Sequence, residues 1–157
     1  MPTATAAARR KLAAVIQLKD LKVFADDRGY LFEGLRRDDA LFGGTFGQVL
    51  VTTIYPGVVK GWHKHARQTD YTLCAVGNVK YCVAYGRAGG TVDIQTFYLG
   101  EHHQTLIKVP PGLWHGYTPT GGERAVLVHV MDTTFDPADT ERKDWLAFGD
   151  VWGVKNG

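Results

Sequence analysis

The sequence contains no long hydrophobic run, no large excess of charge of either sign and few cysteines. Its 157 residues include 18 basic and 16 acidic side chains, which leave a formal net charge of +2. This balance gives no electrostatic basis for binding nucleic acid or an anionic membrane. No apolar run approaches the roughly 20 residues of a membrane-spanning helix. Neither nucleic acid nor a membrane is therefore an expected partner.

The two cysteines, Cys74 and Cys82, each lie within an apolar run. Two cysteines are too few for a disulfide framework or a zinc ribbon. We therefore interpret them as reduced thiols in the core of a cytoplasmic protein.

Glycine, proline and aromatic residues are, by contrast, well represented. The chain has 19 glycines, six prolines and 11% aromatic residues, a mixture that favours short strands and tight turns over long helices. Apolar, β-branched runs separated by turn residues predict about eight short strands, which is typical of a β-sandwich or barrel. The clearest runs cover residues 21–24, 48–55, 71–76, 79–85, 91–99, 105–109 and 125–130.

No repeat or linker divides the chain, so we expect a single domain over residues 19–157. Residues 1–18 are rich in alanine and lack acidic side chains, and we expect a flexible or short helical N-terminal arm there. Residues 136–145 are expected to form one helical turn or a short helix. Gly77-Asn78 separates two strand-like runs by two residues, which predicts a β-hairpin.

Histidines provide the clearest functional signal. His63 and His65 are two residues apart, so on a strand they point to the same face. His115 follows a proline–glycine turn in a second segment. If the two segments form neighbouring strands, three imidazoles and the carboxylate of Asp70 meet in one cavity.

The spacing of these residues resembles the cupin superfamily. The first cupin motif is a glycine, a His-x-His pair, an acid that is usually glutamate, and a second glycine; its counterparts here are Gly57, His63, His65, Asp70 and Gly77. The second motif, Pro-x-Gly-x-x-His, is met by Pro110, Gly112 and His115. The resemblance implies an all-β, cupin-type double-stranded β-helix (jelly-roll barrel) with an active site in its mouth.

A longer set of motifs resembles the dTDP-4-dehydrorhamnose 3,5-epimerase family of nucleotide-sugar enzymes. In chain order these are Asp27-Arg28-Gly29 with Glu33, Phe46-x-Gln48, Gly57-Val-Val-Lys60-Gly61-x-His63, Pro-x-Gly-x-x-His115-Gly116-Tyr117 and Phe135-x-Pro137. The resemblance implies a cofactor-free reaction on a nucleotide-linked keto-sugar. A base removes the proton next to the ketone, and a proton returns on the opposite face.

The resemblance also assigns roles to individual residues. His63 matches the family's base, and His115 matches the histidine near it. Lys60 stands where an arginine usually contacts the nucleotide's phosphate, so the charge is kept but the bidentate fork is lost. Gln48 matches a substrate-contacting glutamine.

Two further matches imply a homodimer. Arg28 and Glu33 correspond to residues that reach the substrate of the partner protomer through exchanged N-terminal strands. The family buries these edge strands and completes its sites across the interface.

Other family positions are changed in this chain. The enolate-stabilising lysine falls on Asp70, and the proton-donating tyrosine falls on His129. The aspartate that partners the base in the family has no clear counterpart in the shorter C-terminal segment, where Asp144 and Asp150 are possible substitutes. Asp70 could instead orient a histidine or raise its basicity, and His129 could serve as the second acid.

The His63-x-His65 pair also resembles that of the short sugar 3,4-ketoisomerases, so His65 joins the catalytic group. Trp62 and Tyr117 flank the histidines and could stack on a base or sugar, although packing in the barrel core explains them nearly as well. Gln68, in the same segment, is assigned to the substrate site.

These observations predict an epimerase or isomerase of a nucleotide-linked 4-keto-6-deoxy sugar, without a metal or other cofactor. One alternative is a metal-dependent cupin, a dioxygenase or metal-assisted isomerase, that holds Fe, Mn, Ni or Zn through His63, His65, Asp70 and His115. Another is a non-catalytic cupin that binds a sugar or small molecule.

Overall fold

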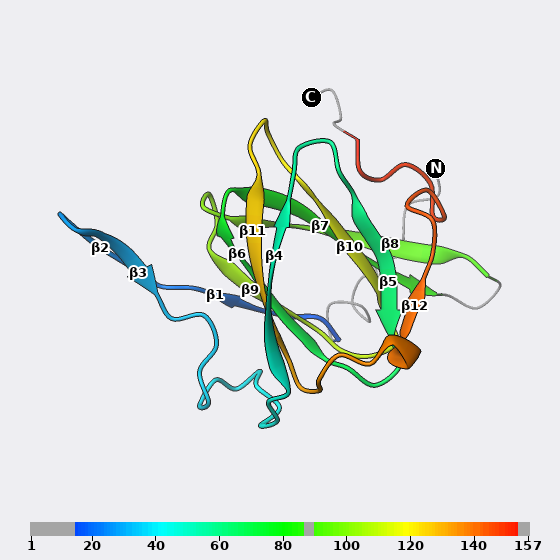
Figure 1. Cartoon of the computed structure of the whole chain (residues 1–157), viewed down its shortest axis with the longest axis horizontal. Helices are drawn as coiled ribbons and strands as arrows, with labels where there is room; N and C mark the ends of the chain where they lie inside the picture. The colour runs from blue at the N-terminus through cyan, green and yellow to red at the C-terminus, as the bar shows by residue number, and fades with distance from the viewer. Residues whose placement is uncertain (1–14, 87–89, 154–157) are drawn as a thin grey trace.

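The computed structural model describes residues 15–86 and 90–153, and most of its regular structure is β-strand (Figure 1). A first five-stranded sheet contains, in spatial order, β1 (Gln17–Asp20), β9 (Thr105–Val109), β6 (Asp70–Val76), β11 (Ala125–Met131) and β4 (Gln48–Ile54). A second contains β12 (Thr140–Arg142), β5 (Lys60–His65), β10 (Trp114–Pro119), β7 (Asn78–Gly86) and β8 (Val92–Gly100). A separate hairpin pairs β2 (Val23–Asp26) with β3 (Gly29–Phe32), and a 3₁₀ turn, η1 (Pro137–Asp139), precedes β12.

This arrangement confirms the predicted all-β jelly roll. Each run predicted as a strand overlaps one in the structure, and η1 supplies the expected turn near residue 137. β1 begins at Gln17, two residues before the expected start of the domain at residue 19, and most of the expected N-terminal arm (residues 1–14) lies outside the described residues. None of the helical structure described is long and apolar enough to cross a membrane.

The hairpin predicted at Gly77-Asn78 is wrong. β6 pairs with β9 and β11, whereas β7 pairs with β8 and β10. The chain therefore turns a corner from one sheet to the other at Gly77, which has a φ of +73°. Asn78 already belongs to β7 and lacks the positive φ that a two-residue hairpin turn of type I′ requires.

Alternation along β6 explains why its sequence reads as a continuous apolar run. Tyr71 and Leu73 pack with Leu41 on the outer face of the first sheet, under the segment that follows the β2–β3 hairpin. Cys74 points to the other face and joins the main core between the sheets. Both cysteines are buried free thiols, as predicted.

The second sheet is covered on its outer face by the C-terminal segment. Trp62 of β5 and Trp114 of β10 pack there with Trp152. Because side chains alternate along a strand, this packing directs the neighbouring residues His63 and His115 to the interior. The tryptophan cluster thus fixes which face of β5 and β10 lines the barrel.

The β2–β3 hairpin projects away from the barrel (Figure 1). It turns at residues 26–29, where Asp26 pairs with Gly29, and it carries the exposed apolar side chains Phe24, Tyr30 and Leu31. A two-stranded ribbon with this much exposed apolar surface is marginally stable by itself.

The corner at Gly77 predicts an unequal response of two glycines to substitution. A Cβ at Gly77 would lie 2.8 Å from the Arg124 carbonyl oxygen, whereas one at Gly121, whose φ is +87°, would meet nothing within 4 Å. Gly121→Ala should cost about 1–2 kcal/mol through φ alone. Gly77→Ala should cost about 2–4 kcal/mol because the contact adds to it. Urea unfolding measures both, and equal losses would show that the corner is not tightly packed.

Candidate active site

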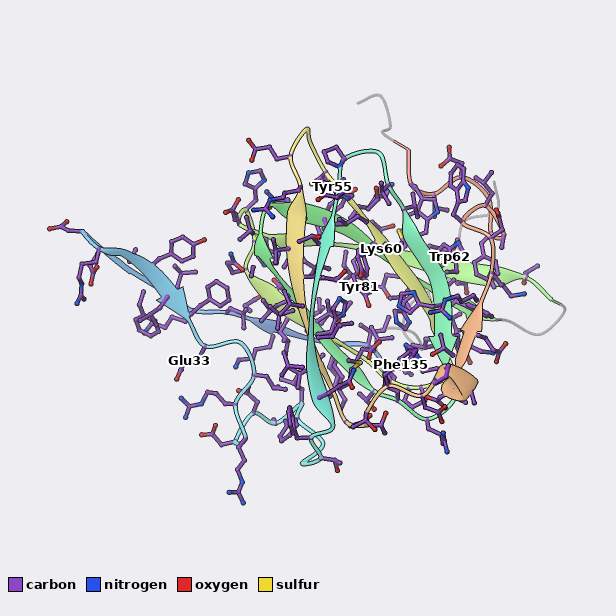
Figure 2. The ribbon with its side chains drawn as sticks, viewed as in Figure 1. Glu33, Tyr55, Lys60, Trp62, Tyr81 and Phe135 are labelled. Carbon is purple, nitrogen blue, oxygen red and sulfur yellow. The ribbon has the colours of Figure 1, made fainter. Side chains whose placement is uncertain are left out.

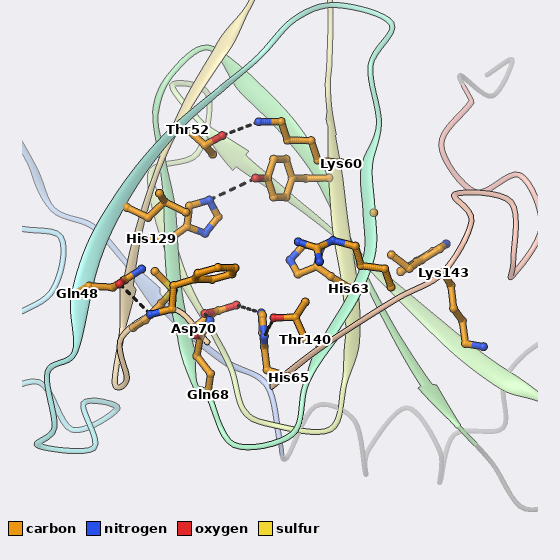
Figure 3. A pocket seen from close by; sticks show the side chains of 17 residues that line it. Gln48, Thr52, Lys60, His63, His65, Gln68, Asp70, His129, Thr140 and Lys143 are labelled. Carbon is orange, nitrogen blue, oxygen red and sulfur yellow. Dashed lines mark hydrogen bonds and ion pairs between the residues drawn. The ribbon is translucent and has the colours of Figure 1, made fainter. Parts of the chain in front are cut away.

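A cavity of about 680 Å³ opens between the two sheets (Figure 3). Its walls come from β4 and β11 of the first sheet, from β5, β10 and β12 of the second, and from the segments between them. The lining residues are Gln48, Leu50, Thr52, Lys60, Gly61, Trp62, His63, His65, Gln68, Asp70, Tyr117, His129, Met131, Phe135, Thr140, Arg142 and Lys143.

The pairing of β5 with β10 assembles the histidine cluster. His63 and His115 are direct partners in the register, and their ring centroids lie 4.1 Å apart. The two strands approach so closely here that a Cβ at Gly116 would lie 2.7 Å from the Cα of Gly61. His65, two residues further along β5, has its ring centroid 5.5 Å from that of His115. The glycine pair therefore permits the contact between the imidazoles.

Asp70 joins the cluster from the opposite sheet. Its carboxylate lies 3.0 Å from Nε2 of His115 and 3.5 Å from Nε2 of His65, and it accepts a hydrogen bond of 2.7 Å from the side-chain amide of Gln68. Burial raises the pKa of Asp70, but the hydrogen bond from His115 and the charges of the imidazoles outweigh burial and lower the pKa to about 2. Asp70 is therefore an anion at physiological pH.

The ring of His115 is held at both nitrogens. Nδ1 lies 3.0 Å from the carbonyl oxygen of Leu113, and Nε2 faces the carboxylate of Asp70. A carbonyl and an ionised carboxylate can only accept hydrogen bonds. Each ring nitrogen of His115 therefore faces a hydrogen-bond acceptor, and these two contacts fix the orientation of the ring.

His63 is in a different situation. Within the described residues its ring has no hydrogen-bond partner, and it borders the open cavity. Burial and the neighbouring His115 hold the pKa of His63 well below its ordinary value, while the field of Asp70 acts in the opposite direction. The imidazole is neutral at physiological pH and can accept a proton from a ligand in the cavity.

A second proton-carrying group lies across the cavity from His63 (Figure 3). Nδ1 of His129 on β11 lies 3.0 Å from the hydroxyl of Thr72, and Nε2 lies 3.4 Å from the hydroxyl of Tyr117. Burial lowers the pKa of His129 to about 4 and raises that of Tyr117 to about 12. Both groups are therefore neutral, and the phenol retains its proton.

Hydrogen bonds hold the rest of the wall in place. Oγ1 of Thr140 lies 3.2 Å from Nδ1 of His65, and the side-chain oxygen of Gln48 accepts a bond of 2.9 Å from the backbone N–H of Phe135. The ammonium of Lys60 donates to the hydroxyl of Thr52 at 2.6 Å and to the Thr53 carbonyl at 2.9 Å. No carboxylate neutralises this ammonium among the described residues, so it presents its charge to the cavity.

Ten of the twelve residues assigned to the site from the sequence therefore border this cavity. They are Gln48, Lys60, Trp62, His63, His65, Gln68, Asp70, His115, Tyr117 and His129.

Trp62 borders the cavity but does not offer its ring to a ligand, and Arg28 and Glu33 lie outside the cavity. Trp62 is 1% exposed, its ring centroid lies 4.7 Å from that of Trp152, and its indole N–H donates to the Trp145 carbonyl, so the ring cannot stack on a ligand in this conformation. Arg28, at the tip of the β2–β3 hairpin, pairs with Asp26.

Glu33 follows the same hairpin, far from the cavity in Figure 2, and pairs with Arg36 at 2.8 Å. The possible substitutes for a base-orienting aspartate also have other roles. Asp144 accepts from the N–H of Leu146, and Asp150 from that of Trp152.

Sequence reasoning missed the residues that β12 contributes. Thr140 and Arg142 line the cavity, although residues 136–145 were expected to form one helical turn or a short helix. A three-residue strand leaves no periodic signal. The alternation of Thr140, Glu141 and Arg142 is too short to be distinguished from a loop.

A jelly-roll barrel with a histidine-rich cavity between its sheets defines the chain as a cupin. Residues 24–142 match the model of the family described as the polysaccharide biosynthesis C-terminal domain. The chain belongs to this family.

Comparisons with individual proteins agree. The chain is 30% identical over 131 residues to the "Probable low-salt glycan biosynthesis epimerase Agl13" of Haloferax volcanii, with 82% of this chain and 84% of the relative covered. It is 29% identical to the spore coat polysaccharide biosynthesis protein SpsL of Bacillus subtilis, with 82% and 85% covered. The crystal structure of a dTDP sugar isomerase from Desulfovibrio desulfuricans superimposes with a TM-score of 0.78 at 25% identity, with 84% and 85% covered. The resemblance to nucleotide-sugar epimerases is confirmed.

Proposed function

We propose that this protein is an epimerase or isomerase of a nucleotide-linked 4-keto-6-deoxy sugar, which it deprotonates next to the ketone. One observation carries the proposal. The neutral imidazole of His63, which has no hydrogen-bond partner among residues 15–86 and 90–153, faces a cavity whose opposite wall holds the His129–Tyr117 pair. Relatives described as a glycan biosynthesis epimerase and a dTDP sugar isomerase support the same class of reaction.

His63 is the proposed base. A neutral imidazole can accept the proton. The negative charge of Asp70 then stabilises the imidazolium that forms. His115 and His65 assist, because their contacts with Asp70 keep the carboxylate beside the base. Asp70 thus has the orienting and charge-compensating role.

The proton that returns to carbon is assigned to the opposite wall. Tyr117 and His129 are hydrogen-bonded to each other, and either can carry a proton toward a ligand between the sheets. A substrate held between the sheets would present one face to His63 and the other to this pair. That arrangement is the one that inversion at carbon requires.

The cavity also suits an anionic nucleotide. Lys60, Arg142 and Lys143 are the basic side chains of its described lining, and Asp70, already paired with His115, is the acidic one. We assign Lys60 to the phosphate, and Gln48 and Gln68 to polar groups of the sugar.

Solvent deuterium exchange tests the base. With TDP-4-keto-6-deoxyglucose as probe in D₂O, the native protein should introduce deuterium next to the ketone. His63→Asn should lower that rate by about 10²–10⁴-fold, since the proton then has no acceptor. Mass spectrometry or NMR measures the exchange, and His102→Asn, an exposed histidine outside the cavity, is the matched control.

Two outcomes contradict this proposal. Exchange that continues unchanged in His63→Asn would remove His63 from the mechanism. Tight binding of the nucleotide sugar without any exchange in the native protein would favour the non-catalytic binding protein instead.

We further propose a cytoplasmic homodimer in which the hairpin completes the partner's site. The hairpin carries exposed apolar residues, and Arg28 and Glu33 lie on it or next to it, outside their own cavity. The outer face of the edge strand β4 exposes Val49 and Val51, which offers an apolar surface of matching character.

Subunit complementation tests this dimer. Arg28→Ala and His63→Asn should each be impaired alone, whereas mixed and reassociated they should recover activity. Each mixed dimer then contains one site with both His63 and the partner's Arg28. Deuterium exchange measures the recovery, and no recovery despite verified subunit mixing would show that Arg28 does not serve the partner's cavity.

A second candidate is metal-assisted isomerisation. One possible ligand atom from each of His63, His65, Asp70 and His115 lies within 4.8 Å of the others. Nδ1 of His65 and of His115 already contacts Thr140 and Leu113, which is the usual way of orienting a metal-binding imidazole. The residues fit a divalent ion, which would supply Lewis-acid polarisation of the ketone.

Chelation separates the two candidates. If the proton transfer needs only side chains, exchange should persist after treatment with EDTA and dialysis, and metal analysis of the treated protein verifies removal. Loss of exchange that returns with Zn²⁺ or Mn²⁺ would instead support the metal-assisted reaction.

A further inference from the structure

Arg142 lines the cavity beside the proposed base His63. It is the last residue of β12, and the register of β12 with β5 places it directly opposite His63, as it places Thr140 opposite His65. Residues opposite each other in an antiparallel pair share one face of the sheet, with Cβ atoms about 5 Å apart.

The contacts along β12 confirm which face is which. Thr140 contacts the inward-facing His65, whereas Glu141 forms an ion pair of 2.7 Å with Lys64 on the outer side. Alternation returns Arg142 to the inner face, and it lines the cavity. A ligand atom held against the His63 imidazole is thus within reach of the guanidinium.

The cavity's other basic side chains already make contacts of their own, and Lys60 is assigned to the phosphate. The ammonium of Lys60 donates to the hydroxyl of Thr52 at 2.6 Å, and the ammonium of Lys143 lies 5.1 Å from the centre of the Trp114 ring. Arg142 forms no ion pair or hydrogen bond through its side chain in the part of the chain that the structure describes. Its five donors are available to a ligand.

The chemistry of the site creates the need for such a donor. Removing a proton next to a ketone leaves negative charge on the ketone oxygen, and Asp70 is an anion close to the base. An anion raises the energy of a nearby enolate, so a positive group must face the oxygen. A guanidinium serves well, because it keeps its charge at any working pH.

We propose that Arg142 donates hydrogen bonds to the ketone oxygen of the substrate and stabilises the enolate formed by His63; this inference rests on the proposed function. In the step, the C–H electron pair becomes the new C=C bond as the proton moves to His63. The C=O π pair moves onto the oxygen. Arg142 keeps all its protons, and the oxygen's charge returns to carbon when carbon is reprotonated.

Substitution of Arg142 tests this role against phosphate binding. In Arg142→Gln, kcat for deuterium exchange into TDP-4-keto-6-deoxyglucose should fall by about 10²–10³-fold, the usual loss for one oxyanion donor. Affinity for TDP alone, measured by calorimetry, should stay within about 2-fold, because TDP has no ketone. Arg142→Lys should recover part of kcat, since it restores the charge without the fork.

Lys64→Gln is the matched control. It also removes one positive charge from the β5–β12 ribbon, but from the outer face, where Lys64 pairs with Glu141. It should exchange deuterium at about the native rate. Urea unfolding of each variant verifies the fold, and Arg142→Lys provides the comparison if Arg142→Gln is unstable.

Three results would overturn the inference. Native kcat in Arg142→Gln would show that the enolate needs no donor from this residue. Weaker TDP binding with unchanged kcat would assign Arg142 to the phosphate. A native protein that exchanges no deuterium would refute the proposed function, and the role of Arg142 with it, whereas the first two results leave the proposed function intact.

Discussion

The buried hydrogen bond between Asp70 and His115 is the contact on which the cavity depends. Asp70 belongs to β6 of one sheet and His115 to β10 of the other, so the pair bridges the two layers at 3.0 Å. Burying charges is costly unless each is paired and hydrogen-bonded. The side-chain amide of Gln68 donates a further hydrogen bond to Asp70, and the Leu113 carbonyl contacts the second ring nitrogen of His115. This bridge joins the two sheets and holds the ring of His115 beside His63.

The division of labour between the sheets follows from the same geometry. The second sheet supplies the proposed base. The first sheet supplies His129, which lies on β11 and contacts Thr72 of the neighbouring strand β6. Tyr117 reaches from the second sheet to His129 and links the two walls. A sugar ring between the layers would meet different chemical groups on its two faces. An epimerase returns the proton to the opposite face of the same carbon, whereas an isomerase delivers it to a different atom. The two reactions therefore differ in which wall of the cavity donates the second proton.

Much of the fold and of the site could be predicted from sequence, because spacing carries the information. His63 and His65 had to share a face on any strand, and the motif around His115 identified the neighbouring strand. The apolar run of β6 gave no indication that its residues face two separate cores. For this reason the sequence did not reveal that the chain passes from one sheet to the other at Gly77. Local turn chemistry favoured a hairpin there, but pairing with distant strands prevailed.

Two residues were misjudged from the sequence, each for its own reason. Trp62 was expected to stack on a ligand because it adjoins His63. Adjacent residues on a strand point to opposite faces, however, and Trp62 packs against Trp152 on the outer face. Arg142 was overlooked because three residues of strand produce no pattern. Its position depends entirely on β12 finding β5, a long-range pairing that local sequence does not encode.

The distribution of the site along the chain has a consequence for how the protein acquires activity. Asp70, His115, His129 and Arg142 reach the cavity from four strands that all pair with partners distant in sequence. Forming such contacts requires closure of long loops before they return any stability. The cavity thus has no local precursor. A chain whose sheets had formed but not yet packed together would hold His115 and Arg142 apart from Asp70 and His129, so turnover reports on completion of the whole barrel.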